Sequence, residues 1–120
     1  MNITEAESKI MEVIWQRGSC TAEQILTGLS GTTDWREGTV KTLINRLLKK
    51  GAISAEADGR RFVYTANGSR ADWVQVESRS FLRRMFGGKV APLVAHFSDR
   101  GELSPGDIAA LRKLIKELEK

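Results

Sequence analysis

The sequence of 120 residues predicts a mainly α-helical protein that contains one small β-hairpin. Three amphipathic segments come first, and they precede Asp58-Gly59, a dipeptide typical of tight hairpin turns. Three more segments with apolar stripes follow the hairpin, separated by glycine and serine residues. Three helices followed by a two-stranded hairpin is the order of a winged helix-turn-helix, here continued by a helical region.

The first two helices are predicted from capping boxes, in which a threonine and a glutamate or glutamine three residues later satisfy free backbone donors. Such a box at Thr4 predicts a helix that runs to about Arg17 and stops at Gly18. A second box at Thr21 predicts a short helix, and residues 30–34 then form a turn-rich connection.

The third helix is predicted over roughly residues 36–50, with Asp34 as a candidate cap and Gly51 as its end. On a helical wheel its apolar residues share one face and are expected in the core: Val40, Leu43, Ile44, Leu47 and Leu48. The opposite face carries Lys41, Thr42, Asn45, Arg46 and Lys49. This helix therefore presents a continuous polar face to a partner or to solvent.

The residue types on that polar face are those that contact DNA. Lysine and arginine bind guanine, asparagine binds adenine, and the threonine methyl packs on the thymine methyl. We expect base edges to be read by Lys41, Thr42, Asn45 and Arg46. Contacts to phosphates, or from the hairpin as a wing, are expected from Arg36, Thr39, Lys49, Lys50, Arg60 and Arg61.

Charge supports this interpretation. The net charge is +4, and residues 36–61 hold seven basic and three acidic side chains, whereas residues 1–35 hold two basic and five acidic ones. A polar helix face by itself is as often a solvated surface, but a basic hairpin close to it favours a DNA interface. A winged-helix module that binds protein and not DNA is the open alternative. An enzyme is not expected, since no catalytic residues and no phosphate-binding loop are recognisable.

Residues 1–68 are thus predicted to form a DNA-binding domain and residues 69–120 a helical dimerisation domain. The second segment has 52 residues, too few to bury its apolar side chains well, so a twofold partner is expected. The alternative is that these helices pack only on their own winged helix. The side chains expected in the dimer interface are Trp73, Phe81, Met85, Phe86, Leu93, Phe97, Ile108, Leu111 and Leu118.

No metal or other cofactor is expected, because one cysteine, Cys20, and one histidine, His96, make a poor ligand set. The apolar runs are too short for a membrane helix, and the first residues lack the pattern of a secretory signal. We therefore expect a cytoplasmic protein without membrane insertion.

Several short segments occur in an order and spacing that together are specific. They are Ala6-Glu7, Val13-Ile14-Trp15, Thr21-Ala22, Trp35, Thr39-Val40-Lys41-Thr42-Leu43, Asn45-Arg46-Leu47, Lys49-Lys50-Gly51, Asp58-Gly59-Arg60, Tyr64, Glu77-Ser78, Phe81-Leu82, Phe86-Gly87-Gly88, Leu93-Val94 and Leu103-Ser104. With them the chain resembles the penicillinase-repressor (BlaI/MecI/CopY) family along nearly its whole length. The resemblance implies a homodimeric transcriptional repressor that binds a palindromic operator of an antibiotic-resistance or stress-response gene.

Two departures from the family pattern concern induction. In the β-lactam branch an asparagine–phenylalanine bond is cleaved, and the corresponding pair here is His96-Phe97. The partner that this resemblance implies is a membrane-bound sensor protease or its product. In the copper-responsive branch paired cysteines near the C-terminus bind metal; residues 98–120 contain no cysteine, so copper sensing is not expected.

Overall fold

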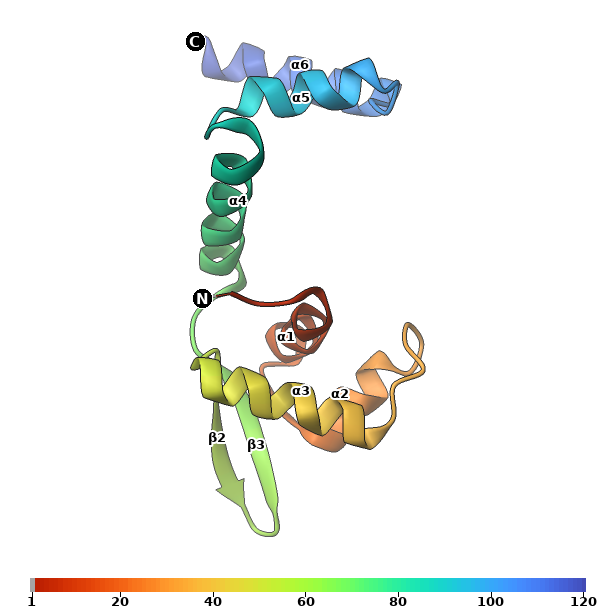
Figure 1. The fold of residues 1–120 in the computed structure, drawn as a ribbon, viewed down its shortest axis with the longest axis vertical. Coiled ribbons are helices and arrows are strands. Elements are labelled where there is room, and N and C mark those ends of the chain that lie inside the picture. Colours follow the sequence, from red (N-terminus) through yellow and green to blue (C-terminus); the bar gives the residue numbers. More distant parts are fainter. Residues whose placement is uncertain (1) are drawn as a thin grey trace. The chain divides into compact units, whose positions relative to one another are not determined.

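The computed structural model describes residues 2–120, and the chain divides into two compact units, Met1–Val74 and Gln75–Lys120. The division falls within a helix. The elements, in chain order, are α1 (Glu5–Arg17), β1 (Ser19–Thr21), α2 (Ala22–Leu29), α3 (Glu37–Lys50), β2 (Ile53–Asp58), β3 (Arg61–Ala66), α4 (Arg70–Phe86), α5 (Val90–Asp99) and α6 (Pro105–Leu118) (Figure 1). The predicted fold class, three helices with a hairpin and then a helical region, is confirmed.

The helix starts follow the predicted capping boxes. The Thr4 side chain accepts from the Glu7 amide while the Glu7 carboxylate accepts from the Thr4 amide, and Thr21 and Gln24 repeat the arrangement. The cap predicted for α3 is wrong: its N-cap residue is Arg36, which makes no side-chain capping bond, and Asp34 lies outside the cap. Gly51, with φ of 76°, ends α3 in the left-handed conformation that glycine adopts readily.

The predicted hairpin is confirmed with one small shift. Strands β2 and β3 pair in antiparallel fashion with Asp58 opposite Arg61, so the two turn residues are Gly59 and Arg60. The turn thus lies one residue later than the Asp58-Gly59 dipeptide, which puts Arg60 at the tip. A third strand, β1, pairs with β3 and was not predicted, since three residues are too short to show strand periodicity.

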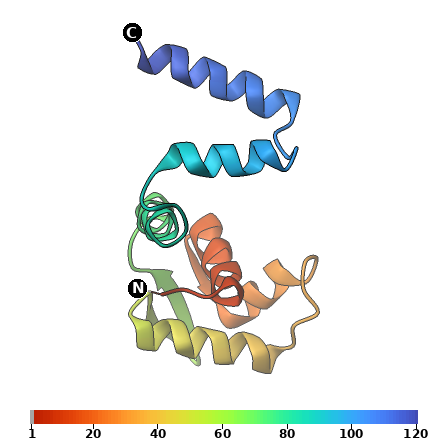
Figure 2. The same cartoon turned by 45° about the horizontal axis from the view of Figure 1, so that its top comes forward.

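The first unit has one apolar core. Helices α1, α2 and α3 pack against one another and against the sheet, and α3 lies along one side of the unit (Figure 2). Among the described residues, the buried apolar side chains lie between Ile3 and Ile53, and Ile10, Ile14, Ile25 and Leu47 have no exposed surface. Trp73, in the first turn of α4, stacks against Trp15 with 5.3 Å between the ring centroids and packs on this core.

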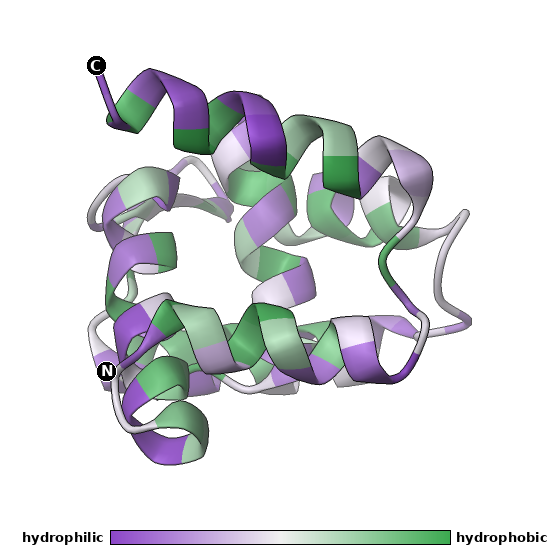
Figure 3. Cartoon of the chain, turned by 90° about the horizontal axis from the view of Figure 1, so that it is seen from above, coloured by the Kyte–Doolittle hydropathy of each residue, from purple (hydrophilic) through white to green (hydrophobic). Residues whose placement is uncertain are grey.

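The second unit is organised differently. Helix α4 ends at Phe86, just before Gly87-Gly88, and α6 starts with a capping box of Ser104 and Asp107. Within Gln75–Lys120, however, no side chain is buried. Hydrophobic and hydrophilic residues alternate around α6 (Figure 3). The large apolar side chains left exposed are Val76, Phe81, Met85, Val90, Phe97, Ile108, Leu114, Ile115 and Leu118.

Candidate nucleic-acid interface

Helix α3 has one buried and one exposed face. The apolar side chains predicted to face inward are buried or half-buried; Val40, Leu43, Ile44 and Leu47 are at most 5% exposed. The five polar residues predicted to face outward are all exposed: Lys41, Thr42, Asn45, Arg46 and Lys49. The core therefore fixes which side of α3 is presented, because a rotation of the helix would expose its leucines to water.

Two outward residues are held by neighbours one helical turn away. The Lys41 ammonium lies 2.9 Å from the Glu37 carboxylate, and this hydrogen-bonded ion pair raises the pKa of Lys41 above its usual value. The Thr42 hydroxyl donates to the Gly38 carbonyl at 2.9 Å. The hydroxyl proton of Thr42 is thus used within the helix, which leaves its methyl group for an apolar contact.

The start of α3 faces a basic, hydroxyl-rich cavity of about 500 Å³. It is lined by Lys9, Thr32, Thr33, Asp34, Trp35, Arg36 and Thr39. Because Arg36 supplies no side-chain cap, the first amide groups of α3 are free to bind an external acceptor. Arg36 and Thr39, both predicted phosphate contacts, therefore lie together at a helix N-terminus that attracts negative charge.

The hairpin brings its arginines to the same side of the unit as the first half of α3. A second cavity, of about 450 Å³, is formed by α2, α3 and the hairpin; its charged lining residues are Glu23, Glu37, Lys41, Arg60 and Arg61. The sequence predicted Lys41 on the third helix and both arginines on the wing. In the structure all three residues border this one cavity. Phe62, which follows them, is 55% exposed.

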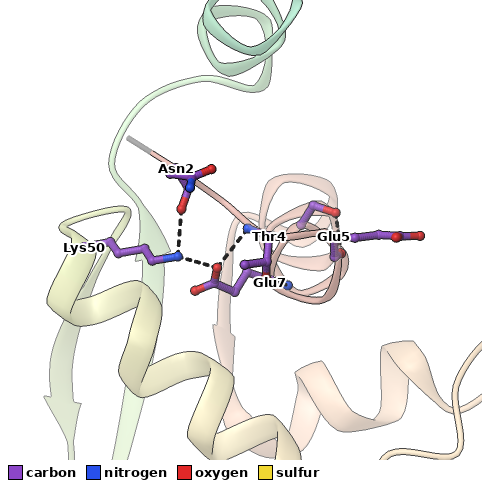
Figure 4. Close-up of polar contacts among 6 residues, drawn as sticks. Asn2, Thr4, Glu5, Glu7 and Lys50 are labelled. Atoms are coloured by element: carbon purple, nitrogen blue, oxygen red, sulfur yellow. Dashed lines mark hydrogen bonds and ion pairs between the residues drawn. The ribbon is translucent and has the colours of Figure 1, made fainter. Parts of the chain in front are cut away.

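Lys50 does not join this group. Its ammonium binds the Glu7 carboxylate and also donates to the Asn2 carbonyl oxygen at 2.7 Å (Figure 4). Glu7 has no exposed surface, so the ion pair links the start of α1 to the end of α3. Because the charge of Lys50 is paired within the unit, a phosphate at Lys50 would have to compete with this ion pair.

The ionisation of Glu7 is set by opposing effects. Burial raises its pKa, but hydrogen bonds from Lys50 and from the Thr4 backbone and side chain lower it, and the net effect is a pKa below 4.5. The sequence indicated Glu7 as a member of the capping box and of a family segment, but not as a buried acid. It also lies three and seven residues before Ile10 and Ile14, on the buried stripe, and this position could have indicated a buried acid in need of a partner.

The residues predicted for the dimer interface fall into two groups. Trp73 packs on Trp15 and on the core of the first unit. The other eight lie in α4, α5 and α6, and none of them is buried within the chain. A shallow, mostly apolar groove of about 410 Å³ on α6 contains Ile108 and Leu111 from the predicted set.

The pair that corresponds to the bond cleaved in the β-lactam branch, His96 and Phe97, lies inside α5. The centroids of their two rings are 5.3 Å apart in an edge-on arrangement, and the centroid of the His96 ring is 6.1 Å from that of the Phe86 ring. Because a protease binds its substrate in an extended form, this bond can be cut only after α5 unwinds locally.

Among residues 2–120, no cluster of three or more histidine, cysteine, aspartate or glutamate side chains is arranged to hold a metal ion. Cys20 lies in β1 with no exposed surface, and burial raises the pKa of its thiol. In the same described range, no helix combines the length and the apolar character that a membrane span needs.

The model of the penicillinase repressor family matches residues 3–117. The penicillinase repressor of Bacillus licheniformis is 36% identical over 96% of this chain and 90% of its own length. The methicillin resistance regulatory protein MecI of Mammaliicoccus sciuri is 30% identical over 96% of this chain and 94% of its own length.

Among solved structures, the DNA-binding domain of the repressor BlaI is 39% identical, with a TM-score of 0.54 over 59% of this chain and 87% of that one. Monomeric BlaI of B. licheniformis, in complex with the blaP half-operator, is also 39% identical and gives a TM-score of 0.53 over 60% of this chain and 88% of that one. A mutant of MarR from E. coli, 18% identical, shares the fold with a TM-score of 0.57 over 99% of this chain and 79% of that one.

The match to the family model covers almost all of the chain, and both units contribute to it. The two BlaI structures, one of them the DNA-binding domain of that repressor, each match more than half of this chain. The chain therefore belongs to the penicillinase repressor family, a family of winged-helix, DNA-binding transcriptional repressors and not of enzymes.

Proposed function

We propose that this chain represses transcription by binding, as a homodimer, to a palindromic operator of an antibiotic-resistance or stress-response gene. The observation that carries the proposal is the exposed polar face of α3, which lies beside a basic hairpin tip. In this proposal α3 enters the major groove, and the wing contacts the backbone or the minor groove next to it. Operator binding places the protein in the cytoplasm, with the chromosome.

The base-reading residues in the proposal are Lys41, Thr42, Asn45 and Arg46. All four are exposed, and they extend from the first half of the helix towards its middle, the part that normally touches base edges. The side-chain hydroxyl of Thr42 is internally bonded, so its methyl group is the part that would pack on a thymine methyl.

The proposed backbone contacts surround these residues. Arg36 and Thr39 lie at the uncapped start of α3, where amide groups favour a phosphate. Lys49 lies exposed at the other end of the helix, and Arg60 and Arg61 extend from the hairpin. Such contacts position the protein on the duplex without reading sequence.

The second unit is the proposed dimerisation region. Exposed apolar side chains of this size are worth about 1.5–3 kcal/mol each when they become buried, and the unit leaves many of them uncovered. A twofold partner would cover them, and it would also place two α3 helices about 34–36 Å apart, or a multiple of that distance, on one face of DNA.

Induction by proteolysis would require a cut within α5. A membrane-bound sensor protease, or its product, would act on the His96–Phe97 bond after unwinding α5. Mass spectrometry of the repressor recovered from β-lactam-treated cells tests this step. A fragment that ends at residue 96 supports it, and an intact chain in derepressed cells contradicts it.

Repression itself is tested by binding the protein to a library of duplexes with a randomised core and sequencing the bound fraction. Enrichment of a palindrome is expected, with an affinity that falls steeply as salt rises, by about 0.9 log units per phosphate contact for each tenfold increase in salt. The combined Thr42→Ala, Asn45→Ala and Arg46→Ala variant should lose that preference. A protein that enriches no sequence would instead support the alternative of a protein-binding module.

A further inference from the structure

Glu37 is an acidic residue in the middle of the proposed DNA interface. It lies in the first turn of α3, and its carboxylate is 2.9 Å from the Lys41 ammonium. The Glu37 side chain is 69% exposed and the Lys41 side chain 60% exposed, so both are accessible to a binding partner. The ion pair nevertheless engages the charge of a proposed base-reading residue before any DNA is bound.

The surroundings of the pair are those of the interface. Glu37 and Lys41 border the cavity between α2, α3 and the hairpin together with Arg60 and Arg61. A carboxylate in this position repels phosphates, which weakens binding to DNA of any sequence. Its presence there is favourable for the interface only if some DNA sequences provide it with a hydrogen-bond donor.

The major-groove edge of a G·C pair provides such a donor in a suitable place. Guanine presents two acceptors, O6 and N7, and the amino group of cytosine lies next to them. A lysine can bind the two acceptors while a carboxylate accepts from the amino group. In an A·T pair the amino group of adenine lies between two acceptors, so a carboxylate there meets oxygen or nitrogen lone pairs on both sides.

We propose that Glu37 is a specificity-determining residue, which acts with Lys41 as an acceptor and donor pair that selects a G·C base pair in the operator. On other DNA sequences the Glu37 carboxylate stays paired with the Lys41 ammonium and repels the phosphates of the DNA backbone. This inference rests on the proposed function, because it requires α3 to lie in the major groove.

The experiment compares the wild type with Glu37→Ala, Lys41→Ala and the double variant on the same randomised library and on one duplex of scrambled sequence. Glu37→Ala is expected to bind the scrambled duplex about two- to fivefold more tightly, the range of one exposed ion pair. It should also lose a G·C preference at one position in each half-site, which lowers the ratio of selected to scrambled affinity by about fivefold.

The matched control is Glu23→Ala, which removes a carboxylate from the same cavity but not the partner of Lys41. It is expected to alter the affinity for all duplexes by one common factor and to leave base preference unchanged. In the Lys41→Ala background, Glu37→Ala should give no tighter binding than Glu23→Ala gives, because no lysine is then released.

The inference is overturned if Glu37→Ala keeps the wild-type base preference, or if its gain on the scrambled duplex persists in full without Lys41. Circular dichroism of each variant shows that α3 is intact, as expected for alanine at exposed helical positions. A wild-type protein that enriches no sequence would overturn the proposed function and this inference with it. A wild type that enriches a palindrome, with unchanged preference in Glu37→Ala, would overturn the role of Glu37 alone.

Discussion

The two units of the chain differ in whether they bury their own apolar side chains. In Met1–Val74 the apolar faces of three helices meet a sheet, and the largest side chains of the core are fully buried. In Gln75–Lys120 helix α6 also starts with a full capping box, yet the apolar side chains of this unit stay exposed. Good local helix signals therefore do not distinguish a unit that is complete by itself from one that needs a partner.

The same helical periodicity of apolar residues has different consequences in α3 and in α6. On α3 an apolar stripe is buried and orients the polar face, whereas on α6 a similar stripe, which includes Ile108, Leu111 and Ile115, borders an open groove. The first unit should thus respond to mutation through its own stability. The second should respond through the concentration at which the chain dimerises.

The largest effect is expected from Leu47→Ala in α3. Leu47 has no exposed surface, and removing its side chain from a packed core costs about 2–5 kcal/mol of the free energy of unfolding. Urea denaturation followed by circular dichroism measures the loss. Lys49→Ala, two residues further along the same helix and exposed, is the control and should change stability by less than about 0.5 kcal/mol. Similar losses for both variants would contradict the core assignment.

The next effect concerns the dimer. Met85→Glu and Ile108→Glu place a charge on exposed apolar positions of α4 and α6, which are 62% and 43% exposed. Each is expected to weaken association by about 2–4 kcal/mol, because an unpaired charge would enter the interface. Sedimentation over a range of concentrations measures this shift. Arg79→Glu, at another exposed position of α4, serves as the control. Unchanged dimers in both test variants would show that these faces are not the interface.

The third effect is pH-dependent and belongs to the first unit. Burial raises the pKa of Glu7, but its bonds to Lys50 and Thr4 lower that pKa by more, so the pKa in the folded protein lies below the pKa in the unfolded chain. The stabilisation is therefore complete above the unfolded pKa and is lost as pH falls through the folded pKa. Lys50→Met leaves Glu7 buried without its cation, and should cost about 2 kcal/mol at pH 7.

This cost should shrink as the pH falls. Glu7 becomes protonated first in the variant, where burial raises its pKa without the opposing bond from Lys50, and then in the wild type, where its pKa is lowered. Urea denaturation of both proteins from pH 7 to pH 3 gives the difference directly. Lys49→Met, which removes a neighbouring exposed lysine, should show no such pH dependence. A constant difference between wild type and Lys50→Met over this range would exclude Glu7 as its origin.

Much of this fold could be predicted because its signals are local. The capping boxes at Thr4, Thr21 and Ser104 depend on residues three apart, and the stripe on α3 repeats over several turns. Strand β1 could not be predicted, because its three residues are held by pairing with β3 more than forty positions away.

The candidate site, too, could be predicted only where its features depend on residues close together in the sequence. Exposure of Lys41, Asn45 and Arg46 follows from helical periodicity alone. The pairing of Lys50 with Glu7 spans 43 positions, and the stacking of Trp73 on Trp15 likewise joins distant segments. In both cases the side chain has a partner inside the unit, whereas its type suggested a partner outside it. A basic or aromatic side chain next to a predicted site is thus the kind of residue that needs a structure.

The smallest effect concerns Gly38, in the first turn of α3. It distinguishes the exposed face of the first unit from its core. A methyl group built on Gly38 would meet nothing within 4 Å, so Gly38→Ala should stabilise the unit by about 0.5–1 kcal/mol through helix propensity. The same methyl would lie on the side that faces DNA in our proposal, and operator affinity should then fall. Gly28→Ala is the contrasting variant, because its methyl would lie 3.0 Å from Val13 in the core and should destabilise. Denaturation and gel-shift titration of both variants test this pair, and a Gly38→Ala protein that is more stable and binds DNA equally well would remove Gly38 from the interface.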